Sequence, residues 1–492
     1  MSPAPHEPHA GRTVRHPSPP PHGECLISPR PDDADPDNPW RSPDRRIAHP
    51  GPSQSRFRSE LGLPPDRPII MSGHQAGLWH AGIAAKWFAV GAAAAARGAS
   101  AAWVVVDQDT NDLFRLPVPV RDMATGQAAR ATWNLVPGPF VAAHDGAPTG
   151  LIPACSPGPF VPPPGRAPEP GVDDSCARII AGLAAHAGAT SAAEQFARAA
   201  SDLLAPLAPA PFLFFASAIS RTGLFAEIVE RMTRDPRACR DAYNAALTEF
   251  PDPTIPPLSE SAATGSELPL WALGRGAVKS RSRVTSSQVA SVERASLAPR
   301  ALLMTGLLRW AGCELFIHGL GGGESGASGY DRITESWFRR WLGVELAPAA
   351  VVTASISRWP SSRPLPSPEA VHRAMWEAHH ARHNPRYLGD IAADNLKHEL
   401  LSAIRDSRLS GRSAAPAFKE LHQLLERVRT SRSAQIDTLD TRARIAGDES
   451  RSATVRSDRT WPFPFLDPAE LERLADRVRA QFRTSAGPGA GP

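Results

Sequence analysis

The sequence predicts an α/β protein with a Rossmann-like core on a parallel sheet, followed by a C-terminal antiparallel helical hairpin that resembles a coiled coil. Three observations lead to this prediction. Residues 68–112 have the order strand, polar turn, helix, strand, residues 211–232 repeat the first three of these elements, and residues 369–445 show mainly helical periodicity. A β-α-β unit gives neighbouring parallel strands joined by a right-handed crossover, whereas two helices around a short turn pack as a hairpin.

The first unit begins with the apolar run Pro68–Ser72, which has the length of a buried strand. Between Leu78 and Arg97 apolar residues recur with helical spacing on an alanine-rich background, and Gly98 suits the end of a helix. Trp103–Val106 is β-branched and apolar, as in a strand buried on both faces. Ligands of such sheets bind beyond the carboxyl ends of the strands, so the polar residues that follow both strands predict a site there.

Two further segments extend this core. Pro211–Ala216 is an apolar run of strand length, and Asp235 is suited to cap one of the helices that follow it. A helix that ends near Trp310 leads into the strand Cys313–Ile317, and another helix begins near Asp331. We expect both strands to join the same sheet as the first unit.

Composition separates the core from the residues before it. Residues 1–60 are rich in Pro, His, Ser and Arg and are expected to form a disordered tail. Residues 61–355 form the expected α/β core. Within it, a Pro/Gly-rich insertion around 124–175 is expected to be a long loop, and the partly polar stretch 251–300 is expected to be rich in loops.

The C-terminal part begins with the helical hairpin, over residues 366–446, in which Pro385 should interrupt the first helix. The second helix carries a narrow apolar stripe flanked by charged residues, a pattern typical of helices that pair. We therefore expect the hairpin to offer a surface for a homodimer. Residues 447–492 are expected to dock on the core and to end in a loose tail.

The overall composition narrows the class of protein. The formal net charge of +4 in 492 residues, without a long basic run, does not indicate nucleic-acid binding. No apolar run approaches the roughly 18 residues of a membrane span, so we do not expect a membrane partner either. With neither nucleic acid nor a membrane indicated, a small-molecule substrate is the expected partner. Five scattered cysteines without a CxxC pair favour a reducing compartment, and the absence of a signal-peptide pattern leads us to expect a cytoplasmic protein.

The candidate catalytic residues directly follow the predicted strands. His74 and Gln75 come after the first strand, Asp107 and Asp109 after the second, and His318 after a later one. Imidazoles and carboxylates at such positions can act as general acids or bases, and carboxylates can also hold Mg²⁺. The alternative is that the acids only cap a loop and that the histidines only pack.

Around them lie residues suited to bind a substrate or an anion, because helix N-termini and Gly-rich loops present unpaired backbone N–H groups. These residues are His80, Gly82, Lys86, Asn111, Gly319, Gly321, Gly322, Gly323, Tyr330 and Asp331. The Gly-rich loop lacks the patterns of a P-loop and of a classical dinucleotide site, and no GxSxG elbow of an α/β-hydrolase follows it.

Together these stretches resemble the bacillithiol-synthesis cysteine-adding enzyme family, which has a pattern like GQQAGLFxGPxxxxxKA after its first strand. Here Gly73–Leu78 is followed by Ala81-Gly82 and then by Lys86. The acidic run after the family's second strand resembles Asp107–Asp112, and its GGPGE-like loop resembles Gly319–Glu324. The resemblance implies a Rossmann-like core similar to that of nucleotidylyl transferases, and the addition of cysteine to an amino-sugar malate.

Three functions remain open at this point. The resemblance implies a ligase-like enzyme that joins an amino acid or a similar small acid to an amine, with ATP and Mg²⁺ as candidate cofactors. His80-Ala81-Gly82 also resembles the first three positions of the HxGH signature, which implies a nucleotidylyl-transferase-like, nucleotide-dependent enzyme. The third function is that of a non-enzymatic scaffold that self-associates through the hairpin, and it leaves the polar strand ends without a role.

Overall fold

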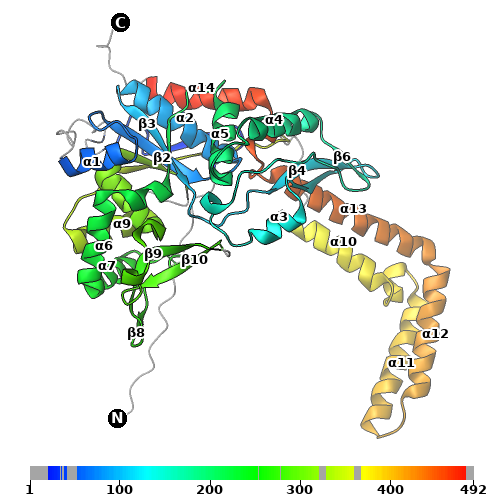
Figure 1. Ribbon diagram of the computed structural model, residues 1–492. Helices are drawn as coiled ribbons and strands as arrows, with labels where there is room; N and C mark the ends of the chain where they lie inside the picture. Colours follow the sequence, from blue (N-terminus) through cyan, green and yellow to red (C-terminus); the bar gives the residue numbers. More distant parts are fainter. Residues whose placement is uncertain are drawn as a thin grey trace, which may run out of the picture.

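The chain folds into a mixed α/β body from which an arm of helices projects (Figure 1). The computed structural model describes residues 20–33, 35, 38–40, 52–252, 254–276, 279–320, 329–359 and 367–483. The prediction of an α/β protein built on a mostly parallel sheet is confirmed.

The body is organised around a six-stranded sheet with the order β1-β13-β12-β2-β3-β7. Its strands are β1 (Cys25–Ser28), β2 (Ile69–Gln75), β3 (Ser100–Val106), β7 (Phe212–Phe215), β12 (Leu315–His318) and β13 (Ala349–Ala354). Every neighbouring pair is parallel except β1 and β13. Ile317 lies opposite Ser72, and Gln75 lies opposite Val106, so the carboxyl ends of β12, β2 and β3 meet at one edge.

Helices cover both faces of this sheet and bury a separate apolar core on each side. The helix α2 lies on one face, and α14 packs against it at the top of the body (Figure 1). The opposite core includes residues of α1, α6, α7, α8 and α9. The helices of the body are α1 (Pro52–Glu60), α2 (Ala81–Ala96), α3 (Gly138–Ala143), α4 (Val172–Ala185), α5 (Ala192–Leu204), α6 (Gly223–Arg234), α7 (Pro236–Glu249), α8 (Ala301–Leu307), α9 (Tyr330–Leu342) and α14 (Pro468–Arg483).

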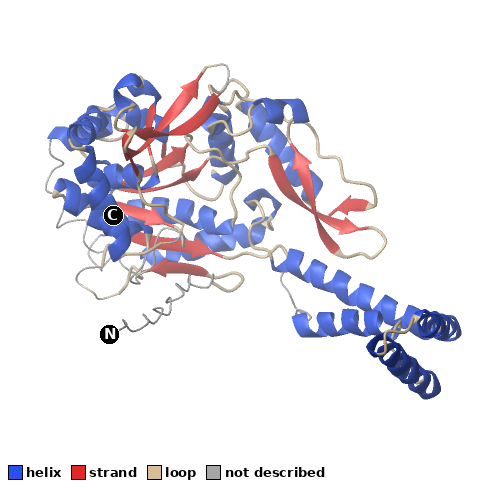
Figure 2. Cartoon of the chain, turned by 90° about the horizontal axis from the view of Figure 1, so that it is seen from below, coloured by secondary structure: helices blue, strands red, loops and turns tan. Residues whose placement is uncertain are grey.

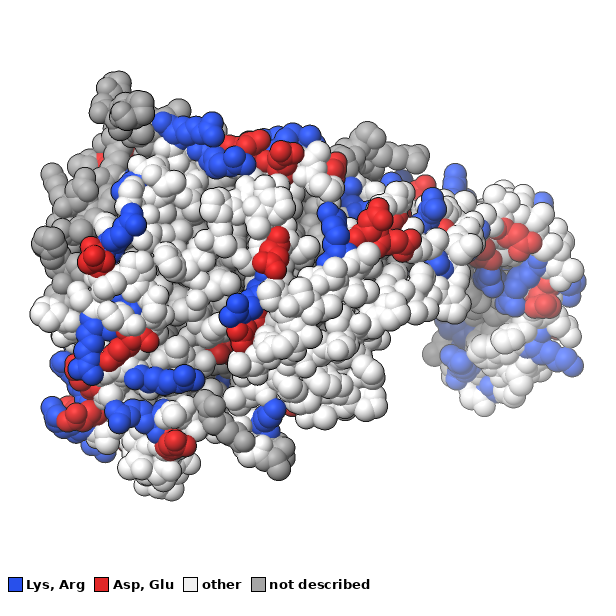
Figure 3. All heavy atoms as spheres, turned by 45° about the horizontal axis from the view of Figure 1, so that its top comes forward, with Lys and Arg blue, Asp and Glu red and all other residues white. Residues whose placement is uncertain are grey.

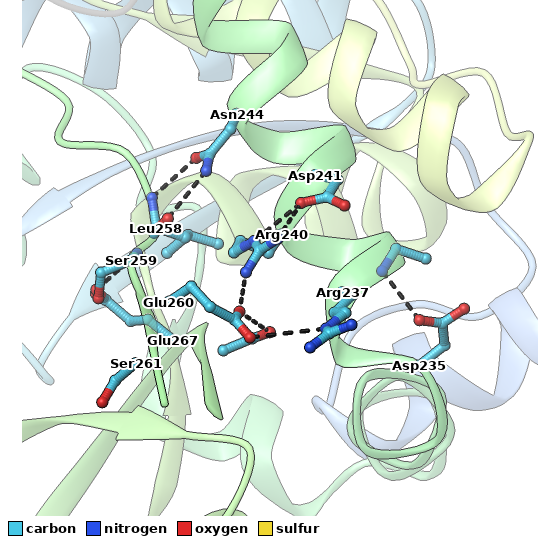
Figure 4. Close-up of polar contacts among 12 residues, drawn as sticks. Asp235, Arg237, Arg240, Asp241, Asn244, Leu258, Ser259, Glu260, Ser261 and Glu267 are labelled. Atoms are coloured by element: carbon cyan, nitrogen blue, oxygen red, sulfur yellow. Dashed lines mark hydrogen bonds and ion pairs between the residues drawn. The ribbon is translucent and has the colours of Figure 1, made fainter. Parts of the chain in front are cut away.

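A second sheet occupies the stretch 251–300, so the prediction that this stretch is mainly loop is wrong. Its strands are β8 (Glu260–Ser261), β9 (Gly265–Arg275), β10 (Lys279–Thr285) and β11 (Leu297–Pro299). Figure 4 shows how α7 is anchored to it: Arg240 and Arg237 form ion pairs with Glu260, and the Asn244 amide bonds both backbone groups of Leu258. β10 is mostly polar and partly exposed, so its apolar signal is weak.

The insertion around 124–175 is also not a simple loop, since it contributes to a three-stranded antiparallel sheet. The strands are β4 (Arg115–Asp122), β5 (Ala128–Asn134) and β6 (Arg166–Pro168). Three of the seven residues of β5 are alanine, which has little intrinsic preference for strands, and its pairing with β4 determines the structure.

Part of the segment predicted to be a disordered tail is ordered. β1 pairs with β13, Trp40 is fully buried against Phe482, and α1 packs beside the core. The prediction for residues 1–60 is therefore wrong in these places, because contacts with distant parts of the chain are invisible to composition. Residues 1–19, 34, 36–37 and 41–51 of that segment, and the tail after residue 483, lie outside the described residues.

The arm that projects from the body is formed by helices of the C-terminal part of the chain (Figures 1 and 2). They are α10 (Pro368–Ala381), α11 (Ile391–Leu409), α12 (Ala415–Ser431) and α13 (Ser433–Ser457). α10 packs along α13 near the body, and α11 packs along α12 at the far end. A short 3₁₀ turn that begins at Pro385 separates α10 from α11, since proline cannot continue the preceding helix.

The surface and the helices give two further facts about partners. On the face drawn in Figure 3, acidic and basic side chains are intermixed rather than gathered by sign. Among the described residues, no helix combines the length and apolar character that a membrane span requires.

Candidate functional site

The predicted strand-end residues come from neighbouring strands. His74 and Gln75 end β2, His318 ends β12, and Asp107 and Asp109 follow β3. Because these strands are adjacent and parallel, all five lie at one edge of the sheet, where ligands of such sheets bind. They nevertheless form four local groups with different partners.

The first group is centred on Lys86, in the second turn of α2. This side chain is only 4% exposed, and its Nζ donates a hydrogen bond of 2.6 Å to the carbonyl oxygen of Gly73. Nζ also lies 5.4 Å from the ring centroid of Trp103. No ion pair joins Lys86 to a carboxylate within the described part of the chain. Burial lowers the pKa of Lys86 to about 7.

Two histidines lie close to this lysine and are neutral at physiological pH. Burial and the charge of Lys86 lower the pKa of His74 to about 3. Burial, Arg459 and Lys86 lower the pKa of His80 to about 4. His80 is the N-cap of α2, and its Nδ1 accepts a 3.0 Å hydrogen bond from the backbone N–H of Gly82. Both imidazoles can therefore exchange hydrogen bonds with an anion, but neither adds positive charge.

The second group joins the end of β12 to the start of α9. His318 Nε2 lies 3.1 Å from Asp331 Oδ1, which also accepts a 2.8 Å hydrogen bond from the buried Arg309. Burial by itself would raise the pKa of Asp331, but the charges of His318 and Arg309 outweigh burial and hold this pKa below its usual value. The carboxyl is therefore ionised. Asp331 therefore places an ionised carboxylate beside the His318 imidazole. Asp331 is thus already engaged by His318 and Arg309, and its role in binding a substrate or an anion stays a prediction.

Tyr330 and the glycines after His318 are also predicted to bind a substrate or an anion. Burial raises the pKa of the Tyr330 hydroxyl, which therefore stays protonated and can only donate or accept a hydrogen bond. Gly319 lies beside Lys86, since a Cβ built on it would be 3.9 Å from Lys86 Cδ. Gly319, the first residue after β12, is thus a neighbour of the lysine side chain. Gly321, Gly322 and Gly323 lie outside the described residues.

The third group links β2, β3 and the second sheet through Asp109. Its Oδ2 accepts a 3.0 Å hydrogen bond from Gln75, and its Oδ1 accepts one of 2.7 Å from Arg281 on β10. Burial raises the pKa of Asp109, but hydrogen bonds from Gln75 and Thr110 and the charge of Arg281 bring it below its usual value. Asn111 donates a 3.0 Å hydrogen bond to the carbonyl of Ala76, which holds the two strand ends together.

Arg281 is a member of the site that the strand-end pattern does not predict. Basic residues alternate with serine in β10, at positions 279, 281 and 283. This period of two is typical of a strand with one basic face and is the signal that could have identified it. The sequence alone does not indicate that this face meets the end of β3.

The fourth group lies on the other side of β3. Asp107 is 5% exposed, its Oδ1 accepts a 2.8 Å hydrogen bond from the Ser217 N–H, and its Oδ2 accepts one of 2.5 Å from the Ser217 hydroxyl. Asp107 lines a pocket that does not include Asp109. Asp107 and Asp109 therefore have different partners, because the chain turns after Val106 and separates their side chains.

The separation of these acids bears on Mg²⁺. Within the described residues, no three side chains of His, Cys, Asp or Glu are grouped as metal ligands. Asp107 and Asp109 are engaged by Ser217, Gln75 and Arg281 instead. The residues present therefore do not fit a resident magnesium ion.

Comparison with known proteins adds no assignment. No protein-family model matches the chain. No curated protein is significantly similar to it. The arrangement of the strand-end groups is therefore the basis for the function.

Proposed function

We propose that this protein is an enzyme with a Rossmann-like core, related to the bacillithiol-synthesis cysteine-adding family, that joins a small acid to an amine. The arm would correspond to the coiled-coil-like hairpin of such an enzyme. The resemblance of residues 73–86 to the family pattern motivates this proposal, and the surroundings of Lys86 support it.

The observation that carries the proposal is that Lys86 is buried at the carboxyl end of a parallel sheet and has no carboxylate partner among the described residues. A buried ammonium group is costly unless a negative charge compensates it. The N-terminus of α2 adds backbone dipoles that also favour an anion. A bound carboxylate or phosphate would supply the missing charge and would stabilise the protonated form of Lys86.

Amide formation defines what such a site must do. A carboxylate does not react with an amine until it is activated, for example by a nucleoside triphosphate that converts it to an acyl phosphate. The amine nitrogen then attacks the acyl carbon, the C–O bond to phosphate breaks, and the nitrogen loses a proton. The reaction therefore requires stabilisation of an anionic leaving group and a base for that proton.

The site residues match these two tasks. Lys86 and the first turn of α2 would hold the acyl phosphate and its leaving group, and the neutral His74 would donate a hydrogen bond to it. His318, which lies beside the ionised Asp331, would accept the proton from the attacking amine. Arg281 would bind a further acidic group on the substrate if it exchanged Asp109 for that group.

Calorimetric titration with ATP and Mg²⁺, followed by cysteine, tests this proposal on the wild type and on Lys86→Met and His74→Ala. We expect both variants to bind ATP at least about tenfold more weakly, because each removes a group that faces the anion. Lys397→Met is the matched control, since Lys397 donates a 2.7 Å hydrogen bond to a backbone carbonyl but lies on the exposed arm. Unchanged ATP affinity in a folded Lys86→Met protein would refute the anion site.

A further inference from the structure

A second pocket lies beside the strand-end site. It has a volume of about 350 Å³ and is formed where β3 and β7 end, with further walls from α5, residues 148–151 and β9. Such a volume is at the lower end of the range for small-molecule sites. Because β3 lies between β2 and β7, this pocket and Lys86 flank the end of the same strand.

The pocket contains one carboxyl group whose charge the protein leaves without an ion pair among the described residues. Asp107 is buried, and the hydrogen bonds to its side chain come from Ser217 alone in that part of the chain. Glu194 is the other acidic residue that lines the pocket. It already accepts hydrogen bonds from Thr190 and forms an ion pair with Arg198. Two hydrogen bonds leave room on a carboxylate for further donors. Burial raises the pKa of Asp107, and a bound cation would lower it again.

The neighbours of Asp107 favour a particular kind of donor. Phe215 lines the same pocket, and an aromatic ring together with a carboxylate is a favourable environment for an ammonium group. Arg221 also lines the pocket and is exposed, so an acidic group on the same ligand could pair with it. The serine and threonine hydroxyls of the wall provide additional hydrogen bonds.

We infer that this pocket binds the amine substrate, with its ammonium group against Asp107 and Phe215 and any acidic group of the same molecule toward Arg221. The identity of the ligand as the amine partner rests on the proposed amide-forming function. The pocket's preference for a cation rests only on its own residues. In this arrangement the amine and the activated acid approach the end of β3 from opposite sides.

Ligand-observed NMR with matched probes tests the inference. We expect the wild type to bind propylamine more tightly than 1-propanol, its neutral counterpart of similar size, and to bind β-alanine most tightly. Asp107→Asn should weaken propylamine binding at least about tenfold, because the amide keeps the shape but removes the charge. Arg221→Gln should weaken β-alanine binding without weakening propylamine binding, because Arg221 is a positive charge that acts on Asp107.

The controls separate charge recognition from a purely structural role of Asp107. Asp112→Asn makes the same change in the same loop, at a residue that pairs with Arg115 outside the pocket, and should bind every probe as the wild type does. If Asp107→Asn does not fold, Phe215→Leu and Arg221→Gln carry the test. Equal binding of propylamine and 1-propanol by the wild type, or unchanged propylamine binding in a folded Asp107→Asn protein, would overturn the inference.

The same variants distinguish this inference from the proposed function. Asp107→Asn should leave ATP binding intact, whereas Lys86→Met should leave propylamine binding intact. If Lys86→Met binds ATP like the wild type while the propylamine results hold, the amide-forming function is refuted but the cation pocket remains. If Asp107→Asn binds propylamine like the wild type while Lys86→Met binds ATP more weakly, the cation pocket is refuted but the anion site at Lys86 remains.

Discussion

Lys86 illustrates how a single residue can indicate a site. The chain contains only four lysines. This one is buried at the carboxyl end of the sheet, and its hydrogen-bond partner is the backbone carbonyl of Gly73. A leucine or methionine would fill the same space without the cost of desolvating a charge. A cost of this kind is typical of functional positions, where stability is given up for chemistry.

Lys86 should make the stability of the protein depend on pH. Its pKa is about 7 in the folded state and about 10.4 in an unfolded chain, so between these values the unfolded state binds more protons. The free energy of unfolding should therefore rise with pH across this window, by on the order of a few kcal/mol. Below about pH 7 the cost of burying the lysine is fully present.

Denaturant unfolding of the wild type and Lys86→Met from pH 7 to pH 10 measures this dependence. We expect Lys86→Met to be more stable than the wild type at pH 7 and to lose most of that advantage by pH 10. Lys397→Met should show a difference from the wild type that does not change with pH. A constant difference for Lys86→Met as well would mean that Lys86 is not desolvated in solution.

For single residues, the sequence predicts where the site residues lie better than it predicts which side chains they contact. The strand ends are predictable, because apolar runs followed by polar residues have a defined meaning in parallel sheets. The pairing of Asp109 with Arg281 and of Asp331 with Arg309 is not, since each arginine comes from a different element. The directions of Asp107 and Asp109 depend on the turn after β3, which has no strong sequence signature.

Among the elements, β2 depends on a glycine that has no room for a side chain. A Cβ on Gly73 would lie 2.2 Å from Val104 Cγ1 and 2.4 Å from the Val104 carbonyl oxygen. The carbonyl belongs to the neighbouring strand β3 and cannot move aside like a flexible side chain. Gly73 therefore lets β2 and β3 approach while its own carbonyl receives the Lys86 hydrogen bond.

Gly73→Ala should consequently destabilise the fold by about 2 kcal/mol or more through overpacking. Gly91→Ala is the matched control, because Gly91 lies inside α2 and a Cβ added there would meet nothing within 4 Å, and it should stabilise the helix by roughly 0.5–1 kcal/mol. Thermal or denaturant unfolding of both variants checks the pair. A Gly73→Ala protein as stable as the wild type would contradict the close approach of β2 to Val104.

The elements also show where sequence patterns are informative. The helices α2, α6 and α7 lie close to their expected bounds, because a helix repeats its apolar signal over several turns. The strands β5 and β10 are not predicted, since neither has a continuous apolar run and each is paired with a neighbour through backbone hydrogen bonds. Backbone pairing has no residue-type requirement and leaves a weaker pattern.

At the scale of the whole molecule, the arm has more apolar surface than its own packing buries. Its core contains residues of α11 and α12 such as Leu400, Ile404 and Leu424. Large apolar side chains nevertheless remain exposed on its surface, among them Met375, Trp376, Ile391 and Leu409, with Ile391 62% and Leu409 82% exposed. Exposed apolar surface of this kind is typical of sites where proteins associate.

We therefore predict that two copies of the chain associate through their arms. Analytical ultracentrifugation of the wild type should show a dimer, and the double variant Ile391→Lys, Leu409→Lys should shift it to monomer. Met123→Lys changes an exposed apolar residue of the body and should leave the dimer intact. A wild type that sediments as a monomer at all concentrations would contradict this prediction.

The packing of α14 on α2 has a consequence for how the protein is made. α2 is almost entirely apolar, and the side that α14 covers cannot be completed until α14 has left the ribosome, long after α2 itself. During this interval the nascent chain carries an uncovered alanine-rich helix, the kind of surface that chaperones hold. The packing around the helix that contains Lys86 is thus completed only when nearly the whole chain has been synthesised.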